Sequence, residues 1–499
     1  MTSSLPRFFA RRPVFAFILL LLFSSSTVFA AGSEGGHHDP LAGFLLFLAL
    51  VVMGAAVGRW ASVKVHQPPV LGELLMGVIA GNIGYHFLHA PLAIVVMNLN
   101  TANEIFLKMW GSGLNVTQIA QTIFTAEQLA PGGSGERLLS ALTGPGGGLI
   151  FSVEFALFVL SQLGVLLLLF MVGLENDVAG MMKVGGRAAA VGIVGTIAPI
   201  GMGLFASWML IPDVPMAKHL FIAATLCATS VGITARVYRD MHRLTSRDAR
   251  IVLGAAVIDD ILALLVLAVV TGIVTTGSFD PYTVARISIL SFIFLGVVIG
   301  LGGYIVRAGI GVFKVIDRSH VLLLYPLCLM LILSWLAAKI GLASIIGAFA
   351  AGLIITTGHL EDEEDERNVT EIMQPIESLL APIFFVLMGM QVNLATFVDP
   401  SIIGLAAALT VVAIISKVIS GYAAGPGADK LSIGFGMMPR GEVGLIFASI
   451  GKSIGVVNES VYSALVVVII VSTMLAPPAM KWSMARFEKK HGYIAPMAD

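Results

Sequence analysis

Residues 252–274 have the sequence VLGAAVIDDILALLVLAVVTGIV, an apolar run in which two adjacent acids, Asp259 and Asp260, lie near the middle. A run of about 20 apolar residues is long enough to cross a bilayer as a helix. Each charge at the centre of such a helix costs about 2.5–3.5 kcal/mol on the insertion scale, so folding alone does not explain the pair. Acids inside a membrane span indicate by default an ion or proton pathway.

The composition of the whole chain agrees with a membrane protein. It has 499 residues, of which 57% are hydrophobic and 12% charged. Soluble domains carry about twice that charged fraction. The net charge of −1 gives no sign of a nucleic-acid partner.

The composition and motifs also argue against several catalytic functions. Cys227 and Cys328 both lie in apolar segments, so no disulfide framework is expected. The full P-loop motif, CxxC and HExxH are absent, so we expect no ATP hydrolysis, no zinc catalysis and no cofactor. The chain is not expected to be an enzyme.

Residues 1–31 have the pattern of a signal peptide. Basic residues between Arg7 and Arg12 precede an apolar core at 14–23, and small residues follow near Ala30. The core is too short to span a bilayer. Cleavage there would leave a mature membrane domain, 32–499, with its N-terminus outside; the alternative is an uncleaved anchor.

Hydropathy predicts an all-α polytopic protein with about 13 spans between residues 41 and 480. The predicted spans are 41–59, 70–90, 150–173, 188–210, 217–236, 249–274, 284–306, 320–337, 341–358, 374–393, 401–423, 431–452 and 459–480.

The basic residues predict the orientation of these spans. Cytoplasmic loops are enriched in Lys and Arg. With the N-terminus outside, the loops predicted inside contain Arg59, Lys64, Lys183, Arg187, Arg236, Arg239, Arg243, Arg247, Arg250, Arg307, Lys314, Arg318, Lys481, Arg486, Lys489 and Lys490. We therefore expect a multi-pass protein of the cell (inner) membrane with a short cytoplasmic tail, 481–499.

Two loops are unusual. Residues 91–149 form a long connection predicted outside, whose middle, Ile105 to Phe124, favours short interfacial helices. Residues 361–366, with the sequence EDEEDE, could sense cations or pH, although a solvated acidic loop is the simpler interpretation.

Lys417 is the counter-charge that the acids require. It lies in the predicted span 401–423, about 7–8 Å from the middle of that helix. It could extend to the membrane surface, but buried charges need partners, so pairing with Asp259 or Asp260 is favoured. Neighbouring residues on a helix point about 100° apart, so one acid can pair while the other faces a cavity.

Two predicted spans have patterns that interrupt a helix. Residues 228–234, ATSVGIT, contain Thr229 and Ser230, and residues 436–444, GMMPRGEVG, contain Arg440 and Glu442. Proline and glycine loosen a helix, and unwound backbone is tolerated in a membrane only inside protein or beside a cavity. Interrupted segments in the two halves of a chain indicate a transporter site. The simpler alternatives are hydroxyls bonded to their own helix and an Arg440–Glu442 pair that neutralises itself.

Other classes fit less well. An intramembrane aspartyl protease needs acids on two different helices, whereas these are neighbours on one. A cation channel requires rings of carbonyls or acids rather than an acid–lysine pair. A membrane scaffold or sensor would leave Asp259, Asp260 and Lys417 without a purpose.

Several motifs together resemble the monovalent cation:proton antiporters that carry a double-aspartate motif. Their order along the chain matches the family. They are residues 67–74 (QPPVLGEL), 163–175 (from LG to LE), 228–236 (ATSVGITAR), 257–260 (VIDD) and 439–442 (PRGE).

The resemblance implies two inverted repeats, a core domain with two discontinuous helices that cross near the ion site, and a dimerisation domain. It implies that Asp260 binds the cation and the proton, that Asp259 pairs with Lys417, and that Thr229 and Ser230 lie at the crossing. Arg440 and Glu442 would support the second crossing helix. The connection 91–149 is longer than is usual, and no nucleotide-binding domain follows the last span, which puts a ligand-gated potassium efflux role in doubt.

A mechanism also follows from the residues. Hard monovalent cations prefer oxygen ligands, and a desolvated carboxylate favours its proton. Proton and cation then compete for one acid, and competition at an alternately exposed site is antiport. We expect electrogenic exchange of H⁺ for Na⁺ or Li⁺, with K⁺ as the alternative cation, and the family resemblance implies a homodimer in the bilayer.

Overall fold

The computed structural model describes residues 40–491, except 66, 127, 132, 175–177, 277–280, 317–319, 356–368, 398–399 and 454. The predicted signal peptide 1–31, the acidic loop 361–366 and the end of the tail lie outside the described residues.

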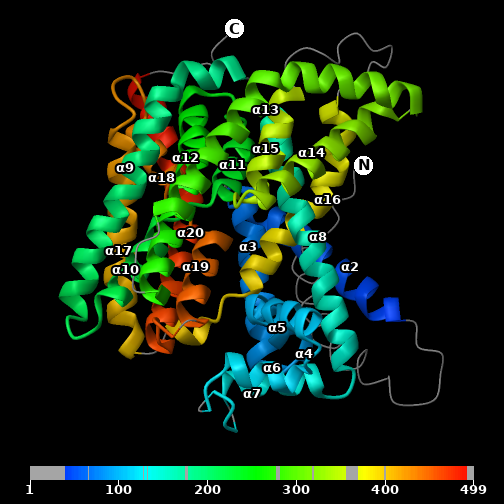
Figure 1. The fold of residues 1–499 in the computed structure, drawn as a ribbon, viewed down its shortest axis with the longest axis vertical. Helices are drawn as coiled ribbons and strands as arrows, with labels where there is room; N and C mark the ends of the chain where they lie inside the picture. Colours follow the sequence, from blue (N-terminus) through cyan, green and yellow to red (C-terminus); the bar gives the residue numbers. More distant parts are fainter. Residues whose placement is uncertain are drawn as a thin grey trace, which may run out of the picture. The chain divides into compact units, whose positions relative to one another are not determined.

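Every regular element within those limits is a helix (Figure 1). In chain order the elements are α2 (Pro40–Lys64), α3 (Pro69–Asn82), the π-helix η3 (Ile83–Phe87), α4 (Pro91–Met97), α5 (Leu99–Ser112), α6 (Val116–Ile123), α7 (Ser134–Thr143), α8 (Gly147–Leu174), α9 (Val178–Leu210), α10 (Met216–Cys227), α11 (Val231–Asp240), α12 (Arg247–Thr276), α13 (Pro281–Ile316), α14 (Val321–Lys339), α15 (Ser344–Ile355), α16 (Val369–Met390), the 3₁₀ turn η4 (Leu394–Phe397), α17 (Pro400–Tyr422), α18 (Lys430–Gly436), α19 (Glu442–Ser453) and α20 (Glu459–His491).

The all-α membrane fold is confirmed. In the described part of the chain, ten helices are long and apolar enough to cross a bilayer, and each matches a predicted span. The other three predicted spans correspond to α12, α15 and the pair α18 and α19. The count of 13 and the inverted repeats stay predictions.

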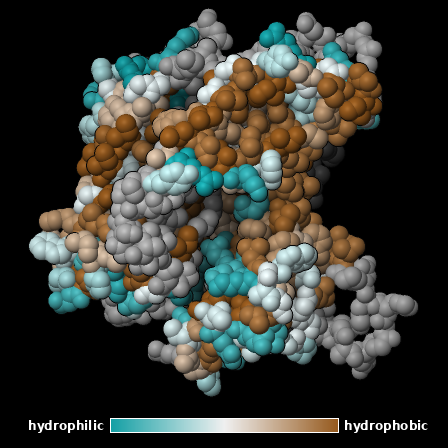
Figure 2. All heavy atoms as spheres, viewed as in Figure 1, coloured by the Kyte–Doolittle hydropathy of each residue, from teal (hydrophilic) through white to brown (hydrophobic). Residues whose placement is uncertain are grey.

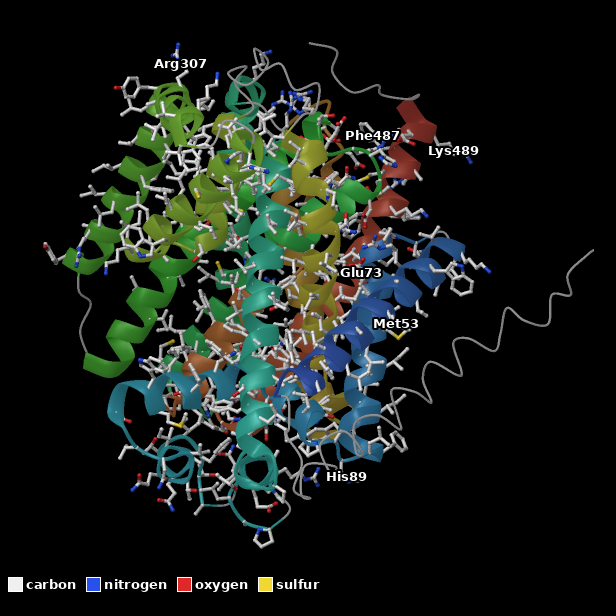
Figure 3. The ribbon with its side chains drawn as sticks, turned by 90° about the vertical axis from the view of Figure 1, so that its right-hand side faces the viewer. Met53, Glu73, His89, Arg307, Phe487 and Lys489 are labelled. Carbon is white, nitrogen blue, oxygen red and sulfur yellow. The ribbon has the colours of Figure 1, made fainter. Side chains whose placement is uncertain are left out.

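Unit 1 comprises the chain up to Gln162 together with Pro382–Leu394. Its helices α2 and α3 pack along each other, and Arg59 donates to the buried Glu73 of α3 at 2.8 Å (Figure 3). Asn82 ties α3 to the 382–394 segment, because its side chain donates to Val392 O at 2.6 Å and accepts from Leu394 N at 2.8 Å. The connection 91–149 folds into the four short helices α4 to α7.

Unit 2 comprises residues 163–381 and 395–499. Its helix α9 packs along both α12 and α17, and α10 packs against α9, α12 and α19. A hydrophobic core joins these helices with α20; it includes Phe221, Ile222, Ala263, Leu409, Phe447 and Leu465. The span formed by α10 and α11 is the most enclosed of the ten, with 94% of its apolar window buried.

The outer helices of unit 2 have an apolar surface. The span Phe292–Ile316 of α13 is only 28% buried, and large apolar side chains of α13 and α14 are exposed, among them Phe292, Ile293, Tyr304 and Trp335. Figure 2 shows hydrophobic side chains gathered over this region. A soluble protein rarely leaves so much apolar surface uncovered, and a bilayer covers it at no cost.

Candidate ion-binding site

Two helices in unit 2 are discontinuous, as predicted. α10 ends at Cys227 and α11 begins at Val231, and the backbone between them is extended, with ψ of 139° at Ala228 and 103° at Ser230. α18 ends at Gly436 and α19 begins at Glu442. The second gap contains Pro439, which has no N–H to donate to a helix.

The two breaks meet and satisfy each other's backbone groups. Ser230 N donates to Pro439 O at 2.8 Å, the Thr229 hydroxyl donates to Met437 O at 3.2 Å, and the Thr234 hydroxyl donates to Gly436 O. Unpaired backbone groups at membrane depth would cost several kcal/mol each, roughly, so these bonds make the crossing possible.

Arg440 joins the crossing to α17. Its side chain is fully buried, and the guanidinium donates to Ala228 O at 2.7 Å and to Ala413 O at 3.3 Å. Its backbone N–H donates to the Thr473 hydroxyl of α20 at 3.2 Å. Arg440 therefore places a positive charge on the Ala228 carbonyl of the first break and on the Ala413 carbonyl of α17. The side chain of Glu442 lies outside the described residues.

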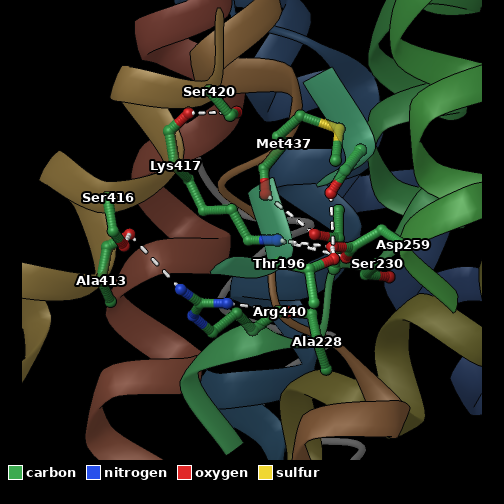
Figure 4. A network of polar contacts seen from close by, with 12 residues as sticks. Thr196, Ala228, Ser230, Asp259, Ala413, Ser416, Lys417, Ser420, Met437 and Arg440 are labelled. Carbon is green, nitrogen blue, oxygen red and sulfur yellow. Dashed lines mark hydrogen bonds and ion pairs between the residues drawn. The ribbon is translucent and has the colours of Figure 1, made fainter. Parts of the chain in front are cut away.

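Asp259 and Lys417 form a fully buried ion pair beside this crossing (Figure 4). Lys417 Nζ lies 3.1 Å from each carboxylate oxygen of Asp259, and neither side chain is exposed. The Thr196 hydroxyl of α9 donates to Asp259 Oδ1 at 2.8 Å. A buried acid is thus provided with a counter-charge and a hydrogen-bond donor, as the interior of a membrane protein requires.

A glycine on α9 allows this third contact. A Cβ added to Gly192 would lie 2.9 Å from Ala255 O and 3.1 Å from Ile258 Cγ2, so only glycine permits α9 to approach α12 this closely. Thr196 lies one turn further along α9 and directs its hydroxyl at Asp259. The approach therefore positions the Thr196 donor.

Asp260 is also buried, with 3% exposure, one residue further along α12. The step of about 100° between neighbours turns its side chain away from the direction in which Asp259 meets Lys417. Ser230 in the first break is 2% exposed, and within the described residues its hydroxyl has no hydrogen-bond partner. A buried hydroxyl without a protein partner is available as an oxygen ligand.

Five of the seven predicted residues fall into two sets. The structure joins Asp259 to Lys417, and it joins Thr229, Ser230 and Arg440 at the crossing. Asp260 is buried next to Asp259 on α12, and the side chain of Glu442 is not among those described.

Sequence reasoning missed several contributors. Thr196, Thr473 and the carbonyls of Ala228 and Ala413 were not predicted. Outside the site, Glu154, a fully buried acid of α8 in unit 1, was not predicted either. Glu154 could have been found by the criterion that found Asp259, since it lies in the predicted span 150–173.

Two discontinuous helices that cross beside a buried acid–lysine pair define a class, the secondary transporters with a site at the crossing. The sequence profile described as sodium/hydrogen exchanger, transmembrane, matches residues 48–486. The chain belongs to this family, and the predicted resemblance is confirmed.

Individual relatives agree. The high-affinity Na(+)/H(+) antiporter NhaS3 of Synechocystis is 32% identical over 459 residues, or 90% of each chain. The Na(+)/H(+)-K(+) antiporter GerN of Bacillus cereus is 32% identical over 66% of this chain and 84% of its own. The structure of the sodium proton antiporter MjNhaP1 from Methanocaldococcus jannaschii has a TM-score of 0.57 at 14% identity, over 91% of this chain and 98% of that one. This last likeness concerns the fold.

Proposed function

We propose that this chain exchanges H⁺ for Na⁺ or Li⁺ and that Asp260 is the carboxylate for which they compete. The observation that carries the proposal is the Asp259–Lys417 pair beside the crossing. It gives Asp259 a fixed counter-charge, and the resemblance of residues 257–260 to the ion-site motif of the family supports Asp260 as the acid that serves the transported ion.

The groups around the break are chemically suited to this cargo. Na⁺ is a hard cation that prefers oxygen ligands. A carboxylate of Asp260, the hydroxyls of Thr229 and Ser230 and carbonyls of the unwound backbone would provide such oxygens. A proton on the same carboxylate removes its charge and with it most of the attraction for a cation, so the two ions exclude each other.

The Asp259–Lys417 pair would add a second proton-binding group to the cycle. Titrations of charged groups this close are coupled. When a cation binds, Asp260 and Lys417 would each release a proton. Both groups would take up a proton again in the other half of the cycle. We therefore propose electrogenic exchange, with more protons than cations moved in each cycle. In proteoliposomes the rate should change with membrane potential, and a rate independent of potential would remove this part of the proposal.

The main experiment measures dequenching of a pH-sensitive dye in everted vesicles. Addition of Na⁺ or Li⁺ should dissipate the pH gradient, and the Asp260→Asn variant, of nearly equal size, should respond no more than vesicles without the protein. A full response from Asp260→Asn would refute the site. A response to K⁺ equal to that to Na⁺ would reassign the cation and leave the site unchanged.

Orientation, processing and assembly belong to the same proposal. The distribution of Lys and Arg supports an outside N-terminus after cleavage near Ala30 and a cytoplasmic C-terminus in the cell (inner) membrane. N-terminal sequencing and cysteine accessibility from each side would test both. The family resemblance supports a homodimer, which cross-linking in membranes would test.

A further inference from the structure

A pocket of about 590 Å³ lies in unit 2, where α17 ends, α18 begins and the last turns of α20 pass. Its lining includes Tyr422, Lys430, Arg486, Phe487 and Lys490, and we call it the α17–α20 pocket. The Asp259–Lys417 site does not include any of these residues.

Positive charge dominates the α17–α20 pocket. As far as the structure describes the chain, Lys430, Arg486 and Lys490 form no ion pair with a carboxylate. Asp429 also lines the pocket; it is 6% exposed, and its carboxylate accepts from Ser432 N at 3.1 Å and from the Ser483 hydroxyl at 3.0 Å, neutral donors that leave its charge in place. Among the described residues, the lining therefore has three cations and one carboxylate, an excess of positive charge.

Close packing fixes the position of the first cation. A Cβ on Gly421 would lie 2.0 Å from Lys430 O, so α17 and α18 touch backbone to backbone at this point. This approach brings Lys430 near the end of α17, and Lys430 Nζ lies 5.5 Å from the centroid of the Tyr422 ring. The pocket is thus built by the fold.

The α17–α20 pocket lies at the ends of two candidate membrane spans, where a membrane surface is expected. The candidate spans Ile402–Tyr422 and Ser460–Lys490 both end at it. Tyr422 is 58% exposed and Trp482 is 55% exposed, and Arg486 lies over the Trp482 ring at 5.5 Å. Exposed Tyr and Trp at the ends of spans mark the headgroup region.

An apolar stripe leads from the bilayer interior to the pocket. Val411, Ile415 and Ile419 of α17 are 54%, 45% and 42% exposed, and their spacing of four places them on one face of the helix together with Tyr422. Leu475 and Trp482 of α20, seven residues apart, are exposed in the same way. A ligand with a charged head and a long apolar tail matches this arrangement.

We propose that the α17–α20 pocket binds the phosphate group of an anionic phospholipid, with an acyl chain lying along the exposed face of α17. Lys and Arg are the usual phosphate donors, and basic pockets between membrane helices accommodate anionic headgroups. A zwitterionic lipid carries its own ammonium group, so it would match three cations less well. The apolar stripe favours a lipid over free phosphate.

Native mass spectrometry of the full chain, titrated with phosphatidylglycerol in detergent, tests this. Each basic residue is expected to contribute about fivefold to the affinity for phosphatidylglycerol. The triple variant Lys430→Gln/Arg486→Gln/Lys490→Gln should therefore bind one phosphatidylglycerol about 100-fold more weakly than the parent does. The matched control is Lys489→Gln, which removes an equal charge from the adjacent position, whose side chain extends away from the neighbouring helices and does not line the pocket (Figure 3). The control should bind as the parent does.

The remaining arms separate the sources of phosphate. Phosphatidylcholine should not fill the site, and inorganic phosphate at millimolar concentration should not displace phosphatidylglycerol. Displacement by inorganic phosphate would identify a soluble phosphate ligand and overturn the lipid assignment, and so would a triple variant that binds phosphatidylglycerol as the parent does. If the triple variant does not fold, Lys490→Gln against Lys489→Gln decides, because both side chains are exposed; equal binding by the two would overturn the proposal.

Discussion

Asp259 of α12 and Glu154 of α8 are both acids without exposed surface in helices that cross the membrane. The Asp259 carboxylate accepts hydrogen bonds from Lys417 Nζ at 3.1 Å and from the Thr196 hydroxyl at 2.8 Å. Glu154 has no hydrogen-bond partner for either oxygen within the described residues. Burial alone therefore does not identify the ion site.

What distinguishes the two acids is the surrounding chemistry. A charged carboxylate without donors is very costly in an apolar interior, whereas a paired one is tolerated. Asp259 lies next to a second acid and beside a crossing of broken helices, and Glu154 lies in an uninterrupted helix. We therefore expect α12 to carry the exchanged ions and Glu154 to be dispensable for exchange.

The largest expected difference is in transport. Asp260→Asn should abolish Na⁺-dependent dequenching in everted vesicles, and Glu154→Gln should keep the parent rate within about twofold, because it removes no interaction that stabilises a transport state. If Glu154→Gln were as inactive as Asp260→Asn, the comparison would fail and Glu154 would belong to a proton route.

The next difference concerns stability. Asp259→Asn leaves Lys417 buried without its counter-charge, and Lys417→Gln does the same to Asp259. Each variant should therefore lower the free energy of unfolding by about 3–5 kcal/mol. The double variant should lose less than the sum of the two losses by about 2 kcal/mol, because the groups are in contact. Unfolding in mixed detergent micelles measures this. The control is Ser416→Ala, a neighbour on α17 whose hydroxyl bonds to Ala413 O within its own helix. Strictly additive losses would contradict the pair.

A smaller effect should follow from moving α9 away from α12. Gly192→Val places a branched side chain against Ala255 O and Ile258. Overpacking of this kind costs about 1–3 kcal/mol, and it should also separate the Thr196 hydroxyl from Asp259. Gly201→Val on the same helix, where an added Cβ meets nothing within 4 Å, is the control. Equal melting temperatures for the two variants would exclude a tight contact at Gly192.

The smallest effect concerns a third acid of α12, at the end of the helix outside the predicted span. Burial, with a smaller contribution from the charge of Asp429, raises the pKa of Asp248 from 3.8 to about 6. The folded state then holds this proton more tightly than the unfolded state, so the contribution of Asp248 to stability is fully present below pH about 4 and is lost as the pH rises through about 6.

Asp248→Asn keeps an acceptor for Asp429 N, which lies 3.3 Å from Asp248 Oδ2, and it cannot lose a proton. It should remove about 1–3 kcal/mol of this pH dependence. Melting temperatures at pH 5 and pH 8 measure this pH dependence. Between pH 5 and pH 8, the melting temperature of the parent should fall more than that of the variant. An equal loss in both would show that Asp248 does not titrate in this range.

Much of the site could be predicted because its residues are conspicuous in an apolar chain. Pro439 and its neighbouring glycines predicted the second break, and one lysine inside a span predicted a counter-charge for the acids. Thr196 could not be predicted in this way, because a hydroxyl in a helix bonds by default to its own backbone, and Gly192 O lies 2.9 Å from the Thr196 hydroxyl as an alternative acceptor. The contact of Thr196 with Asp259 depends on how closely α9 and α12 approach each other. That distance is set by tertiary packing and cannot be predicted from the residues around Thr196.

The basic residues of α20 show the same limit. The sequence identified Arg486 and Lys490 as indicators of orientation. Their grouping with Lys430 depends on the packing of α17, α18 and α20, which brings together residues about 60 positions apart in the chain.

The reciprocal bonding of the two breaks has a mechanical consequence. If one half-helix straightened or swung by itself, the other would lose hydrogen-bonding partners for its backbone. We therefore expect α10, α11, α18 and α19 to move together in any rearrangement of the crossing.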